Sequence, residues 1–423
     1  MMFNKIHFST ILLTVSTCYF AQTNTNPLQN PTNEKVKDIE EVVLKTKAVK
    51  YKSKKENPAY AILKEVWKRK KNNALDKYQT YQFDEYEKIE FGLNNIDSTF
   101  MQKKIFNKMD FIFDYADSTA NGKMALPIFL NESHYKTFGE NKPEKRFKKN
   151  LEAQKTSGFQ DNEIVSLTAK NLFKEINIYD NTINFFNIGF QSPISSDGFS
   201  TYDYNLLGET SIDGETCYRI QYEPKRKDVL AFKGYLYISK DSYAVVKVTL
   251  RSTQKMNVNF VNNVYAEFEY TNPDLETFLP YRTYTEFDLA LTSKNKNTKG
   301  ITSKRTVLYS GYDFDKSIDK EIFDNKEIQT DLKVLAKNED YWDTVRTEEL
   351  SGSEAGIYKM LDQLQEVPKF NHMVKLYETL GSGYINVGKA IDIGDLYSTF
   401  GFNEVEGTRV RLGARTFFSP NDM

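Results

Sequence analysis

The side chains best suited to acid–base, nucleophilic or metal chemistry are scarce in this sequence. His7 lies near the N-terminus, and neither His134 nor His372 has a second ligand at a metal-binding spacing. Cys217 lies in an alternating run typical of a strand, where a lone cysteine is usually a small buried hydrophobic residue. We therefore expect two surface histidines and an inert thiol instead of a catalytic centre.

The carboxylates give no better sign of catalysis. Pairs such as Glu40 with Glu41 and Glu348 with Glu349 are adjacent, and adjacent side chains of an extended chain point to opposite sides. The sequence also lacks the nucleophile elbow, the phosphate-binding loop and the paired-cysteine zinc pattern. It predicts no catalytic, cofactor-binding or metal-binding residues, and we expect a protein that is not an enzyme.

Composition narrows the class of partner. The 423 residues suffice for two or three domains, and 57 Lys and Arg against 58 Asp and Glu leave a formal net charge of -1. This balance offers no basic surplus for a nucleic acid backbone, so we expect no nucleic acid partner. The 30 Phe and 27 Tyr favour antiparallel strands. The basic run at residues 68–71 is interpreted as a solvated helix end, with contact to anionic lipid as the weaker alternative.

The N-terminus has the order of a secretory signal peptide. Lys5 precedes an apolar run, and cleavage after Ala21 would remove residues 1–21. A lipid anchor on Cys18 is an alternative, although Thr17 is a poor residue before a lipidated cysteine. Residues 22–56 are interpreted as a polar leader that ends in a short strand. Export from the cytoplasm is therefore expected.

Residues 57–200 are expected to form an α+β region. Asn57 can cap a helix that begins at Pro58, and apolar residues recur at helical spacing up to Trp67. The remaining predicted elements are a long strand at 81–93, a short strand at 126–130, a charged and exposed stretch at 142–155, a helix at 164–176 and a packed loop at 177–200 containing Phe185, Phe186 and Phe190.

Residues 201–313 alternate as an antiparallel β meander. Strands predicted at 202–212 and 216–222 flank Asp213 and Gly214, a favoured two-residue hairpin turn. Five further strands are predicted at hairpin spacing, at residues 232–238, 243–250, 258–270, 280–291 and 301–312. Such strands form a curved, half-barrel-like sheet whose concave face needs a cover of helices. The predicted fold class is mainly β with α+β elements.

Residues 314–381 are interpreted as a linker with helices, the clearest at 353–364 with Ser353 as its cap. Residues 382–423 alternate again. In one predicted strand the apolar residues Val410, Leu412, Ala414 and Phe418 alternate with Arg409, Arg411, Gly413 and Arg415. In a second, at 383–393, one face carries Ile385, Val387, Ile391 and Ile393.

This alternation is typical of an outer-membrane β-barrel, with the apolar set facing lipid and the arginines facing the lumen. A barrel needs roughly eight or more strands, so the chain is interpreted as the start of a barrel protein or as a truncated relative. A half-buried hairpin in a soluble sheet shows the same alternation and stays an alternative.

Several stretches resemble a family of large envelope proteins from Bacteroidetes-type Gram-negative bacteria, labelled as a domain of unknown function and often named for a carboxypeptidase-regulatory-like domain. The stretches are NPAY at 57–60, NIYDN at 177–181, FQSPIS at 190–195, FKGYLYI at 232–238, NVNFV at 257–261, LYSTF at 396–400 and FNEVEGTR at 402–409. The resemblance implies secretion, a β-rich periplasmic or surface-exposed region and a C-terminal outer-membrane barrel. It brings no established enzymatic activity.

Two departures from that family bear on function. The regulatory-like sandwich is absent or reduced to the strand at 39–49, and most of the barrel is missing, so we expect no pore formed by this chain alone. The meander at 202–312 is also similar in architecture to the half-barrels of lipoprotein carriers, whose concave apolar face binds acyl chains.

Two functions follow from these patterns. The leading hypothesis is a non-enzymatic outer-membrane protein in assembly, transport or anchoring, whose C-terminal strands contact outer-membrane lipid. The alternative is a periplasmic module that binds a lipid or another apolar ligand, and an envelope protein is a further candidate partner. A hydrolase, suggested by the family's name alone, has no residue support.

Overall fold

The computed structural model describes residues 51, 56–157, 173, 175–185, 188–226, 229–253, 261–289, 300–324, 336–348, 350, 352–370, 384–386, 391–394, 400–403 and 407–416. The predicted signal peptide, Cys18 and the strand at 39–49 lie outside the described residues. The helix predicted at 164–176 also lies mostly outside them.

The described residues form one large antiparallel sheet of eleven strands. The meander supplies seven strands in consecutive positions: β7 Tyr202–Ile212, β8 Glu215–Pro224, β9 Phe232–Ser239, β10 Val245–Ser252, β11 Val261–Thr271, β12 Leu279–Leu289 and β13 Gly300–Phe314. Asp213 and Gly214 turn the first hairpin with φ of 47° and 85°, because both central residues of such a turn need positive φ. The predicted meander and the mainly β fold are confirmed.

The region before the meander belongs to the same sheet. β1 Thr80–Asn94 pairs with β13 on one side and with β3 Met124–Glu140 on the other, and β3 also pairs with β2 Asp117–Ser118 and β4 Arg146–Ser157. The strand predicted at 126–130 is thus part of a 17-residue strand. The stretch at 142–155, predicted to be charged and exposed, instead contributes most of β4. Lys149 and Lys155 can lie on a sheet because they pair with carboxylates.

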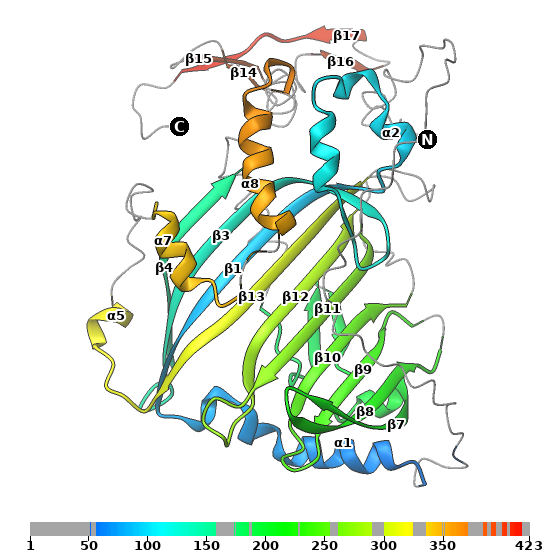
Figure 1. Ribbon diagram of the computed structural model, residues 1–423, viewed down its shortest axis with the longest axis vertical. Coiled ribbons are helices and arrows are strands. Elements are labelled where there is room, and N and C mark those ends of the chain that lie inside the picture. Colours follow the sequence, from blue (N-terminus) through cyan, green and yellow to red (C-terminus); the bar gives the residue numbers. More distant parts are fainter. Residues whose placement is uncertain are drawn as a thin grey trace. The chain divides into compact units, whose positions relative to one another are not determined.

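Helix α1 Pro58–Arg69 begins as predicted, since the Asn57 side chain accepts a hydrogen bond from the Ala59 amide at 3.0 Å. Its buried face, which includes Leu63 and Val66, joins the largest apolar core. In Figure 1, α1 crosses the lower end of the sheet.

The loop predicted at 177–200 is packed, as expected. It contains β5 Thr182–Phe185, β6 Ile188–Gln191 and part of α4 Gly198–Thr201. The Tyr202 and Tyr204 hydroxyls donate to the carbonyls of Gln191 and Pro193 at 2.7 and 2.6 Å. The loop is therefore fixed to the sheet by hydrogen bonds as well as by its buried phenylalanines.

Two faces of the sheet carry different layers. Tyr86 and Ile89 have opposite parity on β1, so they lie on opposite faces. Ile89 belongs to the large core beneath α1 and the packed loop, whereas Tyr86 packs with Trp342 of α7. In Figure 1, α7 Glu339–Val345 lies in front of β3 and β4, and the lower end of α8 Gly352–Gln365 lies in front of the upper part of the sheet.

The shorter helical elements lie before β2 and after β13. They are η1 Lys70–Asn73, η2 Leu75–Lys77, α2 Ser98–Met101, η3 Lys104–Phe106, η4 Asp110–Tyr115 and α5 Lys320–Asp324. Helix α8 agrees with the prediction at 353–364. Its first residue is Gly352, so Ser353 is inside the helix and not its cap.

The C-terminal strands are shorter than predicted. The strand expected at 383–393 is a hairpin of β14 Tyr384–Asn386 and β15 Ile391–Gly394. The strand expected from 408 onward is divided into β17 Gly407–Val410 and β18 Ala414–Thr416. The single-strand predictions are therefore wrong. Gly413, just before β18, supplies a physical reason for the second break, since glycine weakens a strand interior.

Two small sheets contain these strands. β14, β15 and β18 form one of them, whereas β17 pairs with β16 Phe400–Asn403 in the other. The Gly394 amide donates to the Gly413 carbonyl at 3.0 Å, just before β18 begins. No described helix has the length and apolar character needed to cross a bilayer.

Candidate functional site

The residues singled out in the sequence do not come together. Cys217 is fully buried, as predicted, and burial raises the pKa of its thiol to about 12. His372, Glu40, Glu41 and Glu349 lie outside the described residues. No group of three or more His, Cys, Asp or Glu among the described residues could hold a metal ion.

His134 differs from the prediction of a surface histidine. Its side chain is only 12% exposed, and its Nε2 lies 3.2 Å from Asp84 Oδ1. Its Nδ1 lies 2.6 Å from the Tyr341 hydroxyl of α7. The histidine thus joins α7 to the sheet, and neither of its partners was predictable from spacing because they lie 50 and 207 residues away.

The most enclosed charged group in this region is Glu132 on β3, which is 0% exposed. Arg346, just after α7, donates to it from Nε at 2.8 Å and from Nη2 at 2.9 Å. The hydroxyls of Tyr86 and Tyr358 donate to the same carboxylate. A bidentate guanidinium pair with two further donors is a strong and directional arrangement.

Burial alone would raise the pKa of Glu132, but the hydrogen bonds from Arg346, Tyr358 and Tyr86 outweigh burial and lower it. The same burial and the Glu132 charge raise the pKa values of the two tyrosines. The carboxylate therefore stays charged and the hydroxyls stay protonated at neutral pH. This arrangement connects β1, β3, the end of α7 and α8. Its role is to hold the helices in place on the sheet.

A cleft of about 900 Å³ opens beside this network. Its lining residues are Lys155, Glu339, Asp343, Arg346, Leu350, Ala355, Tyr358, Lys359, Asp362, Gln363 and Glu366. Lys155 pairs with Glu339 and lies 4.1 Å from the centre of the Tyr358 ring. Two of its cations, Lys155 and Arg346, are thus already engaged by carboxylates of the chain.

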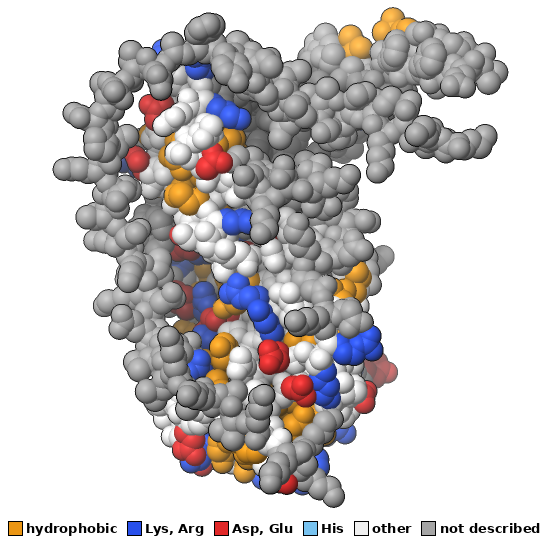
Figure 2. Space-filling model, turned by 90° about the vertical axis from the view of Figure 1, so that its right-hand side faces the viewer, with side chains coloured by type: hydrophobic (Ala, Val, Ile, Leu, Met, Phe, Trp, Pro, Cys, Tyr) orange, Lys and Arg blue, Asp and Glu red, His pale blue; other side chains and the backbone are white. Residues whose placement is uncertain are grey.

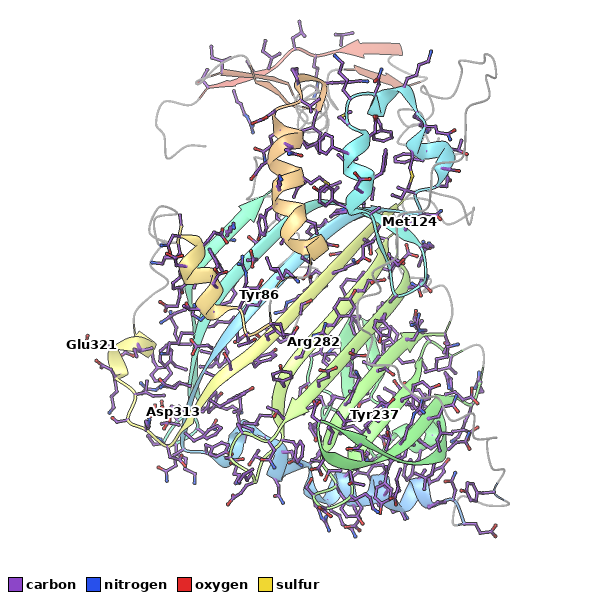
Figure 3. The ribbon with its side chains drawn as sticks, in the orientation of Figure 1. Tyr86, Met124, Tyr237, Arg282, Asp313 and Glu321 are labelled. Carbon is purple, nitrogen blue, oxygen red and sulfur yellow. The ribbon has the colours of Figure 1, made fainter. Side chains whose placement is uncertain are left out.

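A row of mostly polar side chains, interrupted by the buried Leu308, crosses the same face of the sheet. In register from β8 to β1, the row consists of Arg219, Tyr237, Lys247, Glu269, Arg282, Leu308 and Tyr86. Tyr237, Arg282 and Tyr86 lie along one line across the strands in Figure 3.

Opposite charges within and beside this row are paired. Lys247 lies 2.9 Å from Glu269 and 3.1 Å from Glu267, and Arg282 lies 3.6 Å from Glu267. Figure 2 shows a different side, the right-hand side of Figure 1, where the basic and acidic side chains of the described residues are also interspersed. Mutual neutralisation of this kind stabilises a half-buried sheet face and leaves little excess charge for a polyanion.

The opposite face is apolar along much of the sheet but contains two ion pairs whose carboxylates are buried. Glu85 and Glu87 share the parity of Ile89 on β1 and therefore lie on the core face. Lys149 lies 2.6 Å from Glu85, and Arg305 lies 2.6 Å from Glu87. The core is therefore amphipathic, with its charged part on β1, β4 and β13.

The C-terminal strands expose apolar side chains to solvent. Ile391 and Ile393 of β15 are 46% and 41% exposed, Val410 is 64% exposed, and Leu412 is 87% exposed. Register places Ile393 opposite Ala414 and Asp392 opposite Arg415. Cross-strand partners share a face of a sheet, so Ile393 and Ala414 lie on the same face.

Sequence reasoning found the exposed C-terminal side chains but missed the Glu132 network. In the sequence, Asp84, Tyr86, Lys88 and Glu90 share one parity of β1, opposite the parity that carries Phe83, Ile89 and Phe91. This alternation indicates a polar face but does not identify Arg346 as the partner, since that residue lies 214 positions from Glu132.

Comparisons with known proteins give a family and some distant structural likenesses. One is a DUF1329 family protein from Desulfovibrio piger, with 12% identity, 63% of this chain and 97% of that chain covered, and a TM-score of 0.24. Another is a putative outer membrane lipoprotein-sorting protein domain from Vibrio parahaemolyticus, with 10% identity and a TM-score of 0.23. The match covers 62% of this chain and 95% of that domain.

A third is a LolA superfamily protein from Nitrosomonas europaea, with 13% identity and a TM-score of 0.22. The match covers 63% of this chain and 96% of that protein. TM-scores this low support no functional argument. No curated protein matches the chain. Residues 62–305, more than half of the sequence, match the model described as a family of unknown function, DUF5686. The chain belongs to this family, DUF5686.

Proposed function

We propose that the chain is a non-enzymatic cell-envelope protein that is anchored at the outer membrane by its C-terminal strands. The eleven-stranded sheet would lie on the periplasmic or external side and serve assembly or transport there. The observation that carries the proposal is the exposure of Ile391, Ile393, Val410 and Leu412.

The distribution of exposed apolar side chains supports this proposal. Among the described residues, the other large hydrophobic side chains that are exposed are Met124, Phe147, Leu230, Leu275 and Ile301, which are spread over the rest of the chain. Single exposed hydrophobic residues are normal, whereas a group of them marks a binding surface. The C-terminal group lies within 22 residues of sequence, from 391 to 412.

The expected export signal at residues 1–21 agrees with this location, and the resemblance to Bacteroidetes-type envelope proteins points to the same compartment. Together they make outer-membrane lipid the partner that we propose for Ile393 and Leu412. The family model itself assigns no activity.

A matched pair of variants tests the anchor by flotation of the full chain with phospholipid vesicles on a density gradient. Leu412 is 87% exposed and Leu275, in the turn between β11 and β12, is 88% exposed. Because burying a leucine in lipid is worth about 1.5–3 kcal/mol, Leu412→Asp should weaken partition about tenfold or more. Leu275→Asp should leave it unchanged, and equal losses in both variants would refute the proposal.

A second function, binding of a lipid or other apolar ligand, is favoured by the amphipathic core face. Acyl chains would lie near Phe173 and Phe287, whose rings stack at 5.0 Å, and a polar head group would lie near Glu87 and Arg305. Mass spectra of organic extracts from native and delipidated protein test this function. Identical spectra would count against it.

A further inference from the structure

The connection between β17 and β18 combines the most exposed apolar side chains of the C-terminal strands with a cation. Val410 ends β17, Arg411 and Leu412 follow, and β18 begins at Ala414. All residues from 410 to 416 are exposed. We call Val410, Arg411 and Leu412 the anchor tip.

The break in the strand changes what these three residues can contact. In one continuous strand, Val410 and Leu412 would face lipid while Arg411 would face the opposite side. Residues 411–413 are not in a strand, so strict alternation does not apply to them. A short exposed segment with apolar residues around a cation is suited to the boundary between lipid head groups and acyl chains.

The positive charge of Arg411 favours lipids whose head groups carry a net negative charge. Among the described residues no ion pair engages Arg411, whose side chain is exposed. An arginine beside inserted apolar side chains lies at the depth of lipid phosphates, and its fork of N–H donors fits a phosphate well.

We propose that the anchor tip binds the surface of a bilayer with anionic head groups, with Val410 and Leu412 in the acyl boundary and Arg411 on lipid phosphate. This inference rests on the proposed membrane anchoring and adds the class of lipid. It also makes the contact interfacial at this tip.

The test compares flotation of the full chain with phosphatidylcholine vesicles and with vesicles that also contain phosphatidylglycerol. A basic residue near an anionic surface strengthens binding roughly fivefold. Arg411→Glu changes the charge by two units, so it should weaken binding to the anionic vesicles about 30-fold. Arg411→Lys should stay within about threefold of the unchanged chain. Added salt should reduce the difference, because it screens the surface charge.

Lys71→Glu is the matched control, because Lys71 is exposed and its substitution makes the same charge change elsewhere. Lys71 belongs to the basic run at residues 68–71, which is the alternative contact site for anionic lipid. The Lys71→Glu variant should bind as the unchanged chain does. Equal binding to both vesicle types, or equal losses in Arg411→Glu and Lys71→Glu, would overturn the anionic-lipid inference and leave the membrane anchor standing. No binding to either vesicle type would overturn both.

The occupant of the tip could instead be a second copy of the chain. Sedimentation velocity of the chain and of Leu412→Asp separates the two cases. A complex that Leu412→Asp dissociates in the absence of lipid would overturn the inference, and an unchanged sedimentation coefficient supports it. Thermal unfolding of every variant should coincide with that of the unchanged chain, because the substituted side chains are exposed.

Discussion

Replacing Glu132 by glutamine should strongly destabilise the chain, because this side chain is fully buried and accepts from four donors. They belong to three residues: Arg346 donates twice, and Tyr86 and Tyr358 donate once each. Glu132→Gln removes the charge and turns an amide group toward these donors. The Arg346 side chain is only 7% exposed, so its guanidinium would be left without its main counter-charge.

Breaking a buried pair from one side costs about 3–5 kcal/mol. Arg346 also lies 3.4 Å from Glu339 and 3.3 Å from Asp343, and these exposed carboxylates would recover a small part of the loss. We therefore expect Glu132→Gln to lower the free energy of unfolding by about 3 kcal/mol. Arg346→Met should cost about as much, since Glu132 would keep only the two tyrosine donors.

The double variant Glu132→Gln/Arg346→Met separates a buried pair from two independent losses. A buried pair replaced on both sides is often close to neutral, so the double variant should be more stable than the sum of the single losses by several kcal/mol. Urea unfolding of the full chain, followed by circular dichroism, measures each free energy of unfolding. A loss below about 1 kcal/mol for Glu132→Gln, or strict additivity, would refute the reasoning.

The pH dependence has a definite sign. The pKa of Glu132 is lowered from its ordinary value of 4.5, although burial alone would raise it. A lowered pKa in the folded state adds stability above the unfolded value and loses it as pH falls through the folded value. Unfolding free energies should therefore fall below about pH 4.5 in the unchanged chain, and less steeply in Glu132→Gln.

Three further predictions concern the core, a turn and the thiol. Leu63 is 0% exposed in the large core, so Leu63→Ala should cost about 2–5 kcal/mol in urea unfolding, whereas Leu275→Ala should be neutral. Gly214 has φ of 85°, so Gly214→Val should cost about 1 kcal/mol or more by the same measurement, and no loss would contradict the hairpin geometry. In a Cys18→Ser chain, burial and the raised thiol pKa of about 12 should keep Cys217 unreactive to iodoacetamide at pH 8 until urea unfolds the protein, and alkylation of the folded chain would contradict the buried site.

The local rules predicted most of the fold because they act over a few residues. Asn57 and Pro58 mark the start of α1, and Asp213 with Gly214 marks the first hairpin of the meander. The same rules failed at β4, where lysines hide the alternation of a strand. Lys149 and Lys155 lie on a sheet because Glu85 and Glu339, from distant parts of the chain, neutralise them.

The prediction of the C-terminal strands was wrong for a different reason. Alternation predicts the parity of Ile391 and Ile393 but not where a strand ends, and glycines such as Gly413 interrupt the pattern. The Glu132 network was beyond reach, because Arg346 and Tyr358 are brought to β3 by the docking of helices. Such tertiary pairings leave no signal in residue spacing.

The most direct test of the membrane anchor is quenching of tryptophan fluorescence by phospholipids brominated on their acyl chains. Leu412→Trp and Leu275→Trp place the probe at two sites that are equally exposed, at 87% and 88%. The account predicts that brominated vesicles quench the added fluorescence of Leu412→Trp and leave that of Leu275→Trp unchanged. Equal quenching at both sites, or none at position 412, would contradict lipid contact by the C-terminal strands.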